Sequence, residues 1–353
     1  TKTCKRNCYG YFSYDLKNEL EKLQSKHTNH IEFPLLSFFE PKHELYFKND
    51  LVIIDSPIAQ ELFDKIKQIK LPTNKKLKTP FFAKVTKYEY LKTIDSIKKS
   101  IKEGDIYELN YCMEFFNSTI EIDPILTYQK LTKLSATPFS CFVKTNDSFL
   151  MSASPERFLR KEGNKITSEP IKGTAKRGKT NQEDELNKQK LRADEKEQAE
   201  NLMIVDLVRN DLARTAKTGT VKVEELFGIY TFPQVHQMIS RISSELKDNV
   251  HFIDAIKNAF PMGSMTGAPK IKAMELIEKY EKSYRGLFSG AVGFISPSGD
   301  FDFNVIIRSI LFNQKKSYLS FQVGSAITYD SIGDQEYDEC LLKAKAIIEC
   351  LSS

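Results

Sequence analysis

Apolar residues recur at the spacing of an amphipathic helix in several stretches of the chain. In residues 87–105 the apolar positions include Leu91, Ile94, Ile97 and Ile101, which would form one hydrophobic face, and Gly104 would end the helix. The same pattern predicts further helices at residues 16–24, at 183–215 as one long helix that is polar first and apolar later, and at 336–351.

Other stretches alternate between apolar and polar residues, or are rich in β-formers, as strands are. Residues 45–55 predict a hairpin around Asn49-Asp50, and residues 139–171 predict an antiparallel meander. Further β-rich stretches lie at 8–16, at 105–120 and at 287–312, where Pro297-Ser298-Gly299 would form the turn. Segregated antiparallel strands and helices favour an α+β fold, a two-part antiparallel β-sandwich flanked by helices.

The length and composition narrow the class of protein. A chain of 353 residues suggests one large domain or two closely packed parts, and we place a boundary near residue 80, between 1–80 and 81–353. The net charge of +5 is mild, no nucleic-acid motif accompanies the basic runs, and no apolar run approaches the roughly 20 residues that span a bilayer. Six scattered cysteines without a C-x-x-C pair are typical of reduced thiols. We therefore expect a cytoplasmic protein that binds neither nucleic acid nor membrane.

Two predicted helices each carry a pair of glutamates three residues apart. Glu197 and Glu200 form one pair, Glu336 and Glu339 the other, and this spacing places each pair on one helical face. Such pairs are often only surface charge. Glu200, however, is followed at once by the apolar run LMIVDLV, and a carboxylate entering a core needs a partner. Mg²⁺ is a natural partner because it binds few protein carboxylates and keeps several waters.

Residues 168–178, SEPIKGTAKRG, place Lys172 between an apolar pair and the flexible Gly173. Taken alone, this stretch leaves open whether the ammonium group lies on the surface or takes part in chemistry.

Seven stretches of the chain belong together: SASPERF (152–158), PIKGTAKRG (170–178), AENLMIVDLVRNDL (199–212), FPMGSMTGAPK (260–270), YRGLFSGAVG (284–293), NVIIRS (304–309) and EYDECLLKA (336–344). They resemble the chorismate-utilising enzymes, the family that contains the anthranilate, aminodeoxychorismate, isochorismate and salicylate synthases. They occur in the order and spacing of that family and cover roughly residues 85–350, whereas the first 80 residues match mainly through GYFSYDL (10–16). The resemblance implies that 81–353 is a chorismate-binding catalytic domain with a cleft for chorismate and Mg²⁺, and that 1–80 packs on the same fold.

Within the family, PIKGT is typical of the enzymes that aminate chorismate at C4, whereas anthranilate synthases carry PIAGT. The resemblance therefore implies that Lys172 is a covalent nucleophile and Glu156 the general acid that protonates the departing C4 hydroxyl. The expected product is 4-amino-4-deoxychorismate, for 4-aminobenzoate and folate synthesis. An ammonium group cannot attack, and we expect desolvation and the metal to favour the neutral amine of Lys172.

The resemblance also assigns the remaining site residues. Glu200 and Glu339 would bind Mg²⁺ directly, with Glu197 and Glu336 supporting them, and Arg308 would hold the enolpyruvyl carboxylate. The expected substrate contacts are completed by Lys343, Gly173, Thr174, Thr266, Gly324 and His236, the last carried only by the resemblance because a lone histidine is more often a core residue.

Three positions depart from the family pattern, and one of them is Phe288, which stands where many relatives have Tyr. Ala326 stands where a second glycine is usual, which would strain the chain if the position needs positive φ. Glu108 stands where aminating relatives have Gln and water-adding relatives have Lys. The missing lysine argues against an isochorismate synthase, and the carboxylate has no evident role.

Two other functions remain open at this point: an anthranilate synthase component I, which aminates C2 and releases pyruvate, and a non-catalytic chorismate-binding subunit. No cysteine lies in a G-x-C-x-G setting, so we expect ammonia from solution or from a separate glutamine amidotransferase subunit.

Overall fold

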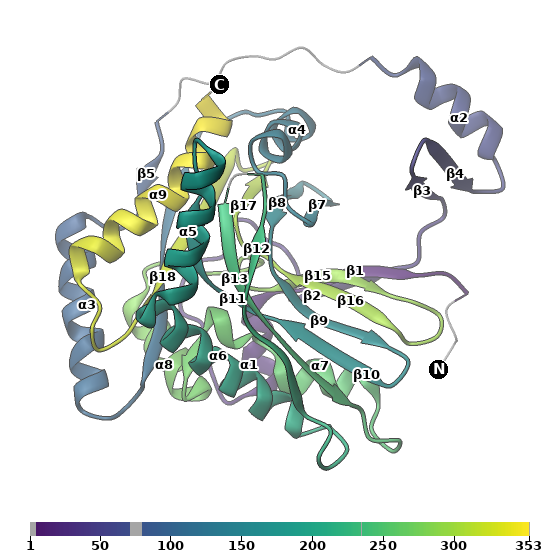
Figure 1. The fold of residues 1–353 in the computed structure, drawn as a ribbon. Coiled ribbons are helices and arrows are strands. Elements are labelled where there is room, and N and C mark those ends of the chain that lie inside the picture. Colours follow the sequence, from purple (N-terminus) through teal and green to yellow (C-terminus); the bar gives the residue numbers. More distant parts are fainter. Residues whose placement is uncertain (1–4, 71–79, 234, 353) are drawn as a thin grey trace.

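Two large antiparallel sheets form the centre of the protein in a computed structural model, which describes residues 5–70, 80–233 and 235–352 (Figure 1). The α+β class predicted from the sequence is confirmed. None of the helices in these three ranges is long and apolar enough to cross a membrane.

The larger sheet has nine strands within the described residues, in the order β11-β13-β10-β9-β16-β15-β1-β2, with β12 also paired to β13. It joins distant parts of the chain, since Tyr9 of β1 pairs with Phe294 of β15. Its strands are β1 (Cys8–Phe12), β2 (Leu36–Phe39), β9 (Arg157–Glu162), β10 (Lys165–Glu169), β11 (Ile171–Lys176), β12 (Lys222–Thr231), β13 (Val235–Glu245), β15 (Ala291–Ile295) and β16 (Phe301–Val305).

The smaller sheet has seven strands in the same described ranges, in the order β14-β6-β18-β17-β8-β7, with β5 paired to β6. Its strands are β5 (Phe82–Ala83), β6 (Glu108–Asn117), β7 (Phe139–Thr145), β8 (Ser148–Ser154), β14 (Gly267–Ala268), β17 (Ser309–Asn313) and β18 (Tyr318–Ile327).

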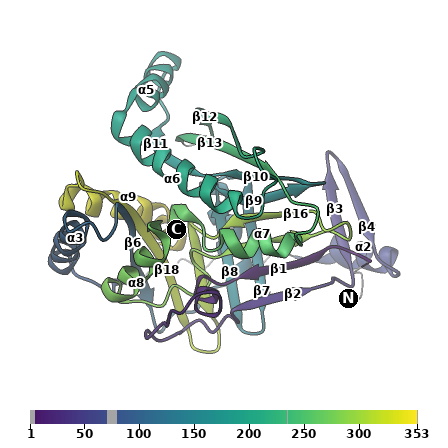
Figure 2. The same cartoon turned by 90° about the horizontal axis from the view of Figure 1, so that it is seen from below.

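The helices divide between the two sheets, and Figure 2 separates the two groups. Those that contact the smaller sheet or one another beside it are α3 (Lys87–Lys102), α4 (Pro124–Leu134), α8 (Lys270–Tyr280) and α9 (Gly333–Ser352). Those on the side of the larger sheet are α5 (Asn181–Ala193), α6 (Glu195–Ala213) and α7 (Phe252–Ala259). Short helical turns complete the set: η1 (Tyr14–Leu16), α1 (Lys17–Leu20) and η2 (Gly263–Met265).

The hydrophobic core accordingly forms two clusters. One includes Phe158, Ile242 and Phe303 from the larger sheet with Ile204 of α6. The other, built on the smaller sheet, includes Leu109, Met113, Phe321 and residues of α3 and α9. The first cluster also contains Leu150, Leu311 and Tyr318 of the smaller sheet, so the two sheets pack against each other there.

The chain passes between the sheets twice in the same region. It leaves β8 and enters β9 through Pro155 and Glu156, and it leaves β16 and enters β17 through residues 306–308. Two backbone hydrogen bonds join the crossings. The Val305 amide donates to the Glu156 carbonyl at 3.0 Å, and the Ala153 amide donates to the Arg308 carbonyl at 3.2 Å. Two predicted site residues, Glu156 and Arg308, therefore lie where the sheets meet.

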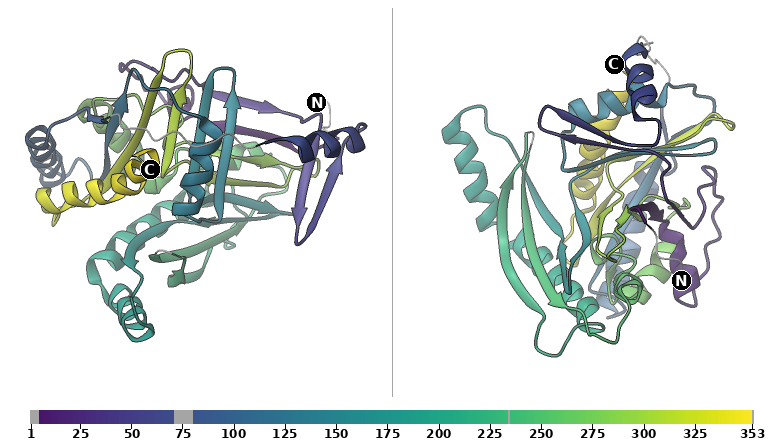
Figure 3. Two further views of the ribbon diagram at one scale, coloured as in Figure 1. Left: turned by 90° about the horizontal axis from the view of Figure 1, so that it is seen from above. Right: turned by 90° about the vertical axis from the view of Figure 1, so that its right-hand side faces the viewer.

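A hairpin of β3 (Glu44–Lys48) and β4 (Leu51–Asp55), followed by α2 (Ala59–Gln68), lies apart from the two large sheets (Figure 3). The predicted hairpin at 45–55 is confirmed. No residue of α2 is buried, and Phe47 of β3 is 77% exposed.

Three sequence predictions are wrong. The helix predicted at 183–215 is two helices, because Asp194 is extended (φ −73°, ψ 108°) and its carboxylate caps α6 by accepting from the Glu197 amide at 3.1 Å. The helix predicted at 16–24 is only the single turn of α1. The meander at 139–171 divides between the two sheets after Ser154, since Pro155 has no amide hydrogen with which to continue a ladder.

Candidate active site

Lys172 lies in a bulge of β11, on the larger sheet. Ile171 pairs with Ile239 and Thr174 with Gln237, so β11 has one residue more than β13 in this interval. Such a bulge redirects a side chain, and Gly173 supports it with φ of +91°. A Cβ on Gly173 would lie 3.2 Å from Glu197 Oε2, so glycine also lets β11 run close to α6.

The Lys172 ammonium group reaches across to the smaller sheet. Its Nζ donates to Oε1 of Glu108, on β6, at 2.9 Å; the side chains are 11% and 1% exposed. Burial alone would lower the pKa of Lys172, but the carboxylates of Glu108, Glu200 and Glu156 outweigh it and raise the pKa. Desolvation thus favours the neutral amine, as expected, but in the protein alone the neighbouring carboxylates prevail.

Glu156 lies close to Lys172 and is itself buried. Burial raises its pKa to about 7, against the opposing effects of the Ser264 hydroxyl, Lys172 and Arg308. Ser264 Oγ donates to Glu156 Oε1 at 2.6 Å. Sequence reasoning missed Ser264, although it lies within the FPMGSMTGAPK stretch, because nothing local to that stretch indicates which residue its hydroxyl meets.

The two glutamate pairs lie on facing helices, α6 and α9. Lys196 Nζ lies 3.3 Å from Glu336 Oε1 on α9 and 3.8 Å from Glu200 Oε1 on its own helix. Burial raises the pKa of Glu200 to about 7 and also raises the pKa of Glu197, which Glu339 raises further. Sequence reasoning missed Lys196, which occupies the space between the two helices.

The carboxylates of the same region are candidate metal ligands. Within the described ranges, three or more His, Cys, Asp or Glu side chains nowhere gather closely enough to hold a metal ion. The donors are nevertheless all carboxylate oxygens, which suit a hard cation, and the position of Lys196 shows that one positive charge fits between Glu200 and Glu336. The donor set therefore fits Mg²⁺ in its chemistry, although within the described residues the carboxylates are not gathered into a ready-made metal site.

Lys343 links α9 to β18. Its Nζ donates to the Gly324 carbonyl at 2.7 Å and lies 2.6 Å from Glu339 Oε1. Burial would raise the pKa of Glu339, but the Lys343 ammonium outweighs this and lowers it. Gly324 is required by space, since a Cβ there would lie 2.5 Å from the sulfur of Cys112.

The strain expected at Ala326 is absent. Ala326 pairs with Asn110 within β18 and is not among the described residues with positive φ. The expectation was conditional on a left-handed backbone, and a regular strand does not need one.

The remaining predicted substrate contacts, Arg308, Thr266 and Thr174, differ in their surroundings. Arg308 has φ of +50°, and burial lowers its pKa while Glu156 opposes that change. The Thr266 hydroxyl donates to its own turn, to the Met262 carbonyl at 3.1 Å, and Thr174 is exposed.

His236 is fully buried and bonded to its neighbours rather than to the residues around Lys172. Its Nε2 lies 2.9 Å from Oδ1 of Asp184, on α5, and its Nδ1 lies 3.0 Å from the Thr231 hydroxyl. Sequence reasoning missed Asp184, which stands among other acidic residues in the first turn of a surface helix.

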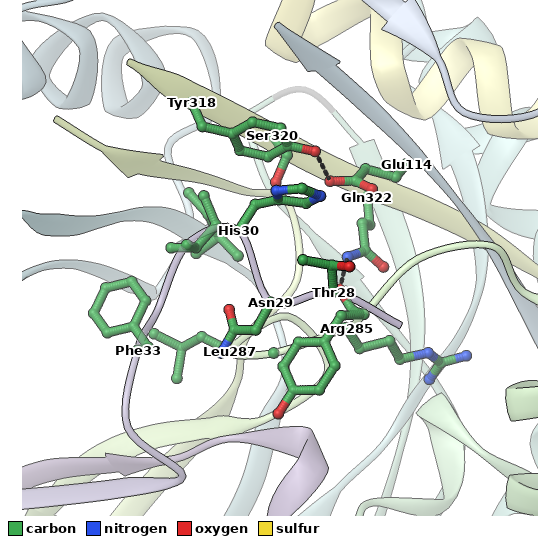
Figure 4. Close-up of a pocket in the computed structure, with 14 residues that line it drawn as sticks. Thr28, Asn29, His30, Phe33, Glu114, Arg285, Leu287, Tyr318, Ser320 and Gln322 are labelled. Atoms are coloured by element: carbon green, nitrogen blue, oxygen red, sulfur yellow. Dashed lines mark hydrogen bonds between the residues drawn. The ribbon is translucent and has the colours of Figure 1, made fainter. Parts of the chain in front are cut away.

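Two hollows accompany this arrangement. One is lined by Glu156 and Ser264, together with residues of α6 such as Asp211, so it adjoins the buried carboxyl group. The other contains none of the predicted site residues (Figure 4). There His30 stacks on Tyr318 at 4.5 Å between ring centroids, and the Tyr318 hydroxyl donates to Glu114 Oε1 at 3.0 Å. The charged groups gathered around Lys172 identify the first region, not the second, as the candidate active site.

Comparison with known proteins places these residues in a family. Residues 1–349 match the profile of a family described as chorismate binding enzyme. Aminodeoxychorismate synthase component 1 of Salmonella typhimurium is 34% identical over 349 residues, covering 98% of this chain and 76% of that protein.

A plant protein and a solved structure are also similar. The chloroplastic aminodeoxychorismate synthase of Arabidopsis thaliana is 38% identical over 272 residues, which cover 76% of this chain but only 29% of the much longer plant protein. The crystal structure of anthranilate synthase component I from Streptococcus pneumoniae superposes with a TM-score of 0.84 at 25% identity, covering 97% of this chain and 80% of that one.

Proposed function

The chain belongs to the chorismate-binding enzyme family, and on that premise we propose that it is an aminodeoxychorismate synthase component 1 that aminates chorismate at C4. One observation carries this proposal: Lys172, in a bulge that turns it inward, has its ammonium group in the field of the buried Glu156 and Glu200 carboxyl groups. A lysine on the protein surface would have neither partner.

In the first half of the reaction, neutral Lys172 attacks C2 of chorismate and forms a carbon–nitrogen bond. The ring double bonds shift and the C4–oxygen bond breaks. Glu156 donates its proton to the departing oxygen, which leaves as water. A carboxyl group with a pKa of about 7 is about half protonated at pH 7 and can act as this acid.

In the second half, ammonia attacks C4, the double bonds shift back, and the C2–nitrogen bond breaks with its electron pair returning to Lys172. The new C4 ammonium group can return a proton to Glu156, so the overall change is chorismate plus ammonia giving 4-amino-4-deoxychorismate plus water. Because C4 loses its hydroxyl group in the first step and gains the amino group in the second, the scheme leaves C4 with its original configuration.

The proposal includes Mg²⁺, held by Glu200 and Glu339 with support from Glu197 and Glu336. When bound, the ion would neutralise these carboxylates and attract the ring carboxylate of the substrate. Arg308 lies near Glu156, and its planar guanidinium suits the second substrate carboxylate.

Ammonia would come from a separate glutamine amidotransferase subunit, in keeping with the name component 1 of the Salmonella relative. The isolated chain should then use ammonium salts, but not glutamine, as the nitrogen source.

The experiment that tests the proposal withholds ammonia. With chorismate and Mg²⁺, intact-protein mass should rise by chorismate less one water, and peptide mapping should place the label in residues 170–178. Lys172→Ala should lose the adduct, whereas Lys176→Ala, a change to an exposed lysine on the same strand, should keep it. An unlabelled wild-type protein that still forms aminodeoxychorismate would exclude the covalent route.

The similarity to a solved anthranilate synthase component I favours a second candidate, amination at C2 with loss of pyruvate. The products separate the two functions. Anthranilate is fluorescent, whereas aminodeoxychorismate gives 4-aminobenzoate only after a separate lyase is added.

A further inference from the structure

Glu108 is a buried carboxylate at the reacting nitrogen that has no role in the reaction described above. We propose that Glu108 is the proton acceptor that converts the Lys172 ammonium group into the attacking amine. This inference rests on the proposed function, because it assumes that Lys172 is the nucleophile.

The geometry gives the Lys172 proton a direct path. Glu108 Oε1 lies 2.9 Å from Lys172 Nζ and is its hydrogen-bond acceptor in the described part of the chain. With the two side chains 11% and 1% exposed, bulk water has little access to this contact. A proton that leaves the nitrogen must therefore move to a group of the protein, and Glu108 is already hydrogen-bonded to it.

The other carboxyl groups that face Lys172 are committed elsewhere. Glu156 must hold a proton to act as the acid, and it accepts a hydrogen bond from Ser264. Glu200 lies 3.8 Å from Lys196 and belongs to the proposed metal-binding set, and Glu197 and Glu339 act on Lys172 only through their charge. Arg308, which interacts electrostatically with Glu156, is a guanidinium cation and cannot accept a proton.

The second oxygen of Glu108 leaves the carboxylate uncommitted to other donors. Among the described residues, Oε2 is buried and has no hydrogen-bond partner, so the hydrogen bond from Lys172 is the one that this side chain accepts there. When substrate fills the site and excludes water, the buried ion pair loses solvation and the neutral pair, amine and carboxylic acid, becomes accessible.

The proton is returned within each turnover. The N–H bond of Lys172 breaks, its electron pair stays on nitrogen, and an O–H bond forms at Glu108 Oε1. After ammonia has displaced the lysine from C2, the amine takes the proton back and the ion pair is restored. Neither an external base nor an additional reactant is required.

The test measures the rate of adduct formation without ammonia, between pH 5.5 and 7, with Mg²⁺ saturating at each pH. In the wild type the rate should be nearly independent of pH over this range, because the proton moves inside the pair. In Glu108→Gln, Lys172 must lose its proton to solvent, so the rate should fall about tenfold for each unit of pH below 7. Glu108→Asp keeps a carboxylate and should restore the flat profile at a lower rate.

A matched control is Glu114→Gln, which changes another buried carboxylate of β6, about 20 Å along the strand, and should keep the wild-type profile. Adduct formation in the wild type with an equally flat profile in Glu108→Gln would overturn this inference alone. No adduct in the wild type would overturn the covalent route of the proposed function, and this inference with it, whereas the absence of aminodeoxychorismate as a product would overturn the proposed function itself.

A second measurement needs no chorismate. Competitive labelling of ligand-free protein with acetic anhydride reports the fraction of Lys172 that is neutral. Removing the Glu108 charge should lower the pKa of Lys172 by at least about one unit, so labelling of Lys172 at pH 9 should rise about tenfold in Glu108→Gln. Unchanged labelling in a variant whose unfolding midpoint matches the wild type would show that the ion pair does not control this proton.

Discussion

At the residue scale, Glu156 combines burial with a specific hydroxyl partner. It is 4% exposed and accepts a hydrogen bond from Ser264, yet burial still raises its pKa to about 7. Near neutral pH the group therefore exists in both protonation states, as a residue that gives and regains a proton in each turnover requires.

The same pKa makes the stability of the protein depend on pH. Because the folded-state pKa lies above the ordinary value of 4.5, the folded state penalises the carboxylate at high pH, and the penalty disappears as the pH falls below 4.5. Glu156→Gln removes the charge, so it should abolish turnover but stabilise the ligand-free protein by up to about 3 kcal/mol more at pH 8 than at pH 4.5.

Urea unfolding at the two pH values measures this difference. Glu121→Gln, on the surface, should give the same small change at both. A Glu156→Gln variant whose effect on the free energy of unfolding is equal at pH 4.5 and pH 8 would contradict the raised pKa.

The sequence indicates which residues belong to the candidate site, but it does not indicate which of them are in contact. The family motifs indicate Lys172 and Glu156 from the sequence, because each stands at a fixed place within a recognisable stretch. They do not indicate that Lys172 meets Glu108, 64 positions earlier along the chain. Nor do they reveal Ser264 as the partner of Glu156, since such contacts arise only when distant strands are brought together.

At the scale of elements, α6 and α9 present the carboxylates to each other. The break at Asp194 contributes, because the cap starts a new helix just before the first of the two glutamates, Glu197. Apolar spacing predicted helical structure on both sides of this break but could not reveal it, since Asp is compatible with a helix in a charged run and also caps a new one.

The two helices give a prediction about the metal. Glu200→Gln removes a carboxylate from the set and should raise the Mg²⁺ concentration needed for half-maximal activity at least about tenfold. Glu195→Gln changes an exposed residue of the same helix and should leave it unchanged.

A direct binding measurement supports the activity assay. In titrations with Mn²⁺, the electron paramagnetic resonance signal of free ion should remain higher with Glu200→Gln than with the wild type or Glu195→Gln. Full wild-type turnover in excess chelator would remove the reason for placing a metal here.

At the scale of the whole molecule, the candidate site belongs to neither sheet alone. Lys172 comes from the larger sheet, Glu108 from the smaller, and Glu156 and Arg308 from the crossings between them. The sequence predicts the α+β class and most strands, because alternation is a local signal. It does not predict that the strands at 139–171 divide between two sheets, because pairing partners are chosen by contacts far along the chain.

The boundary near residue 80 remains a prediction, and the sheet topology suggests how to test it. β1 and β2 complete the larger sheet, and Tyr11 and Phe33 from this region lie in its hydrophobic core. A chain of residues 81–353 would lack these side chains and leave the edge of β15 unpaired. It should therefore unfold at a lower urea concentration than the full chain, with loss of cooperativity, or aggregate.

Urea titration followed by circular dichroism and tyrosine fluorescence would detect the change. Adding residues 1–80 as a separate polypeptide should restore part of the lost stability. A fragment 81–353 that unfolds as cooperatively as the full chain would show that the N-terminal segment is dispensable for folding.

The pairing of β1 also has a consequence for synthesis of the protein on the ribosome. Tyr9 is made 285 residues before its partner Phe294. At cellular elongation rates of about 5–20 residues per second, β1 waits roughly 15 to 60 s for the strand beside it. During that interval Tyr11 and Phe12 have no finished sheet to cover them, so the nascent chain depends on chaperones or on transient contacts until β15 has been made.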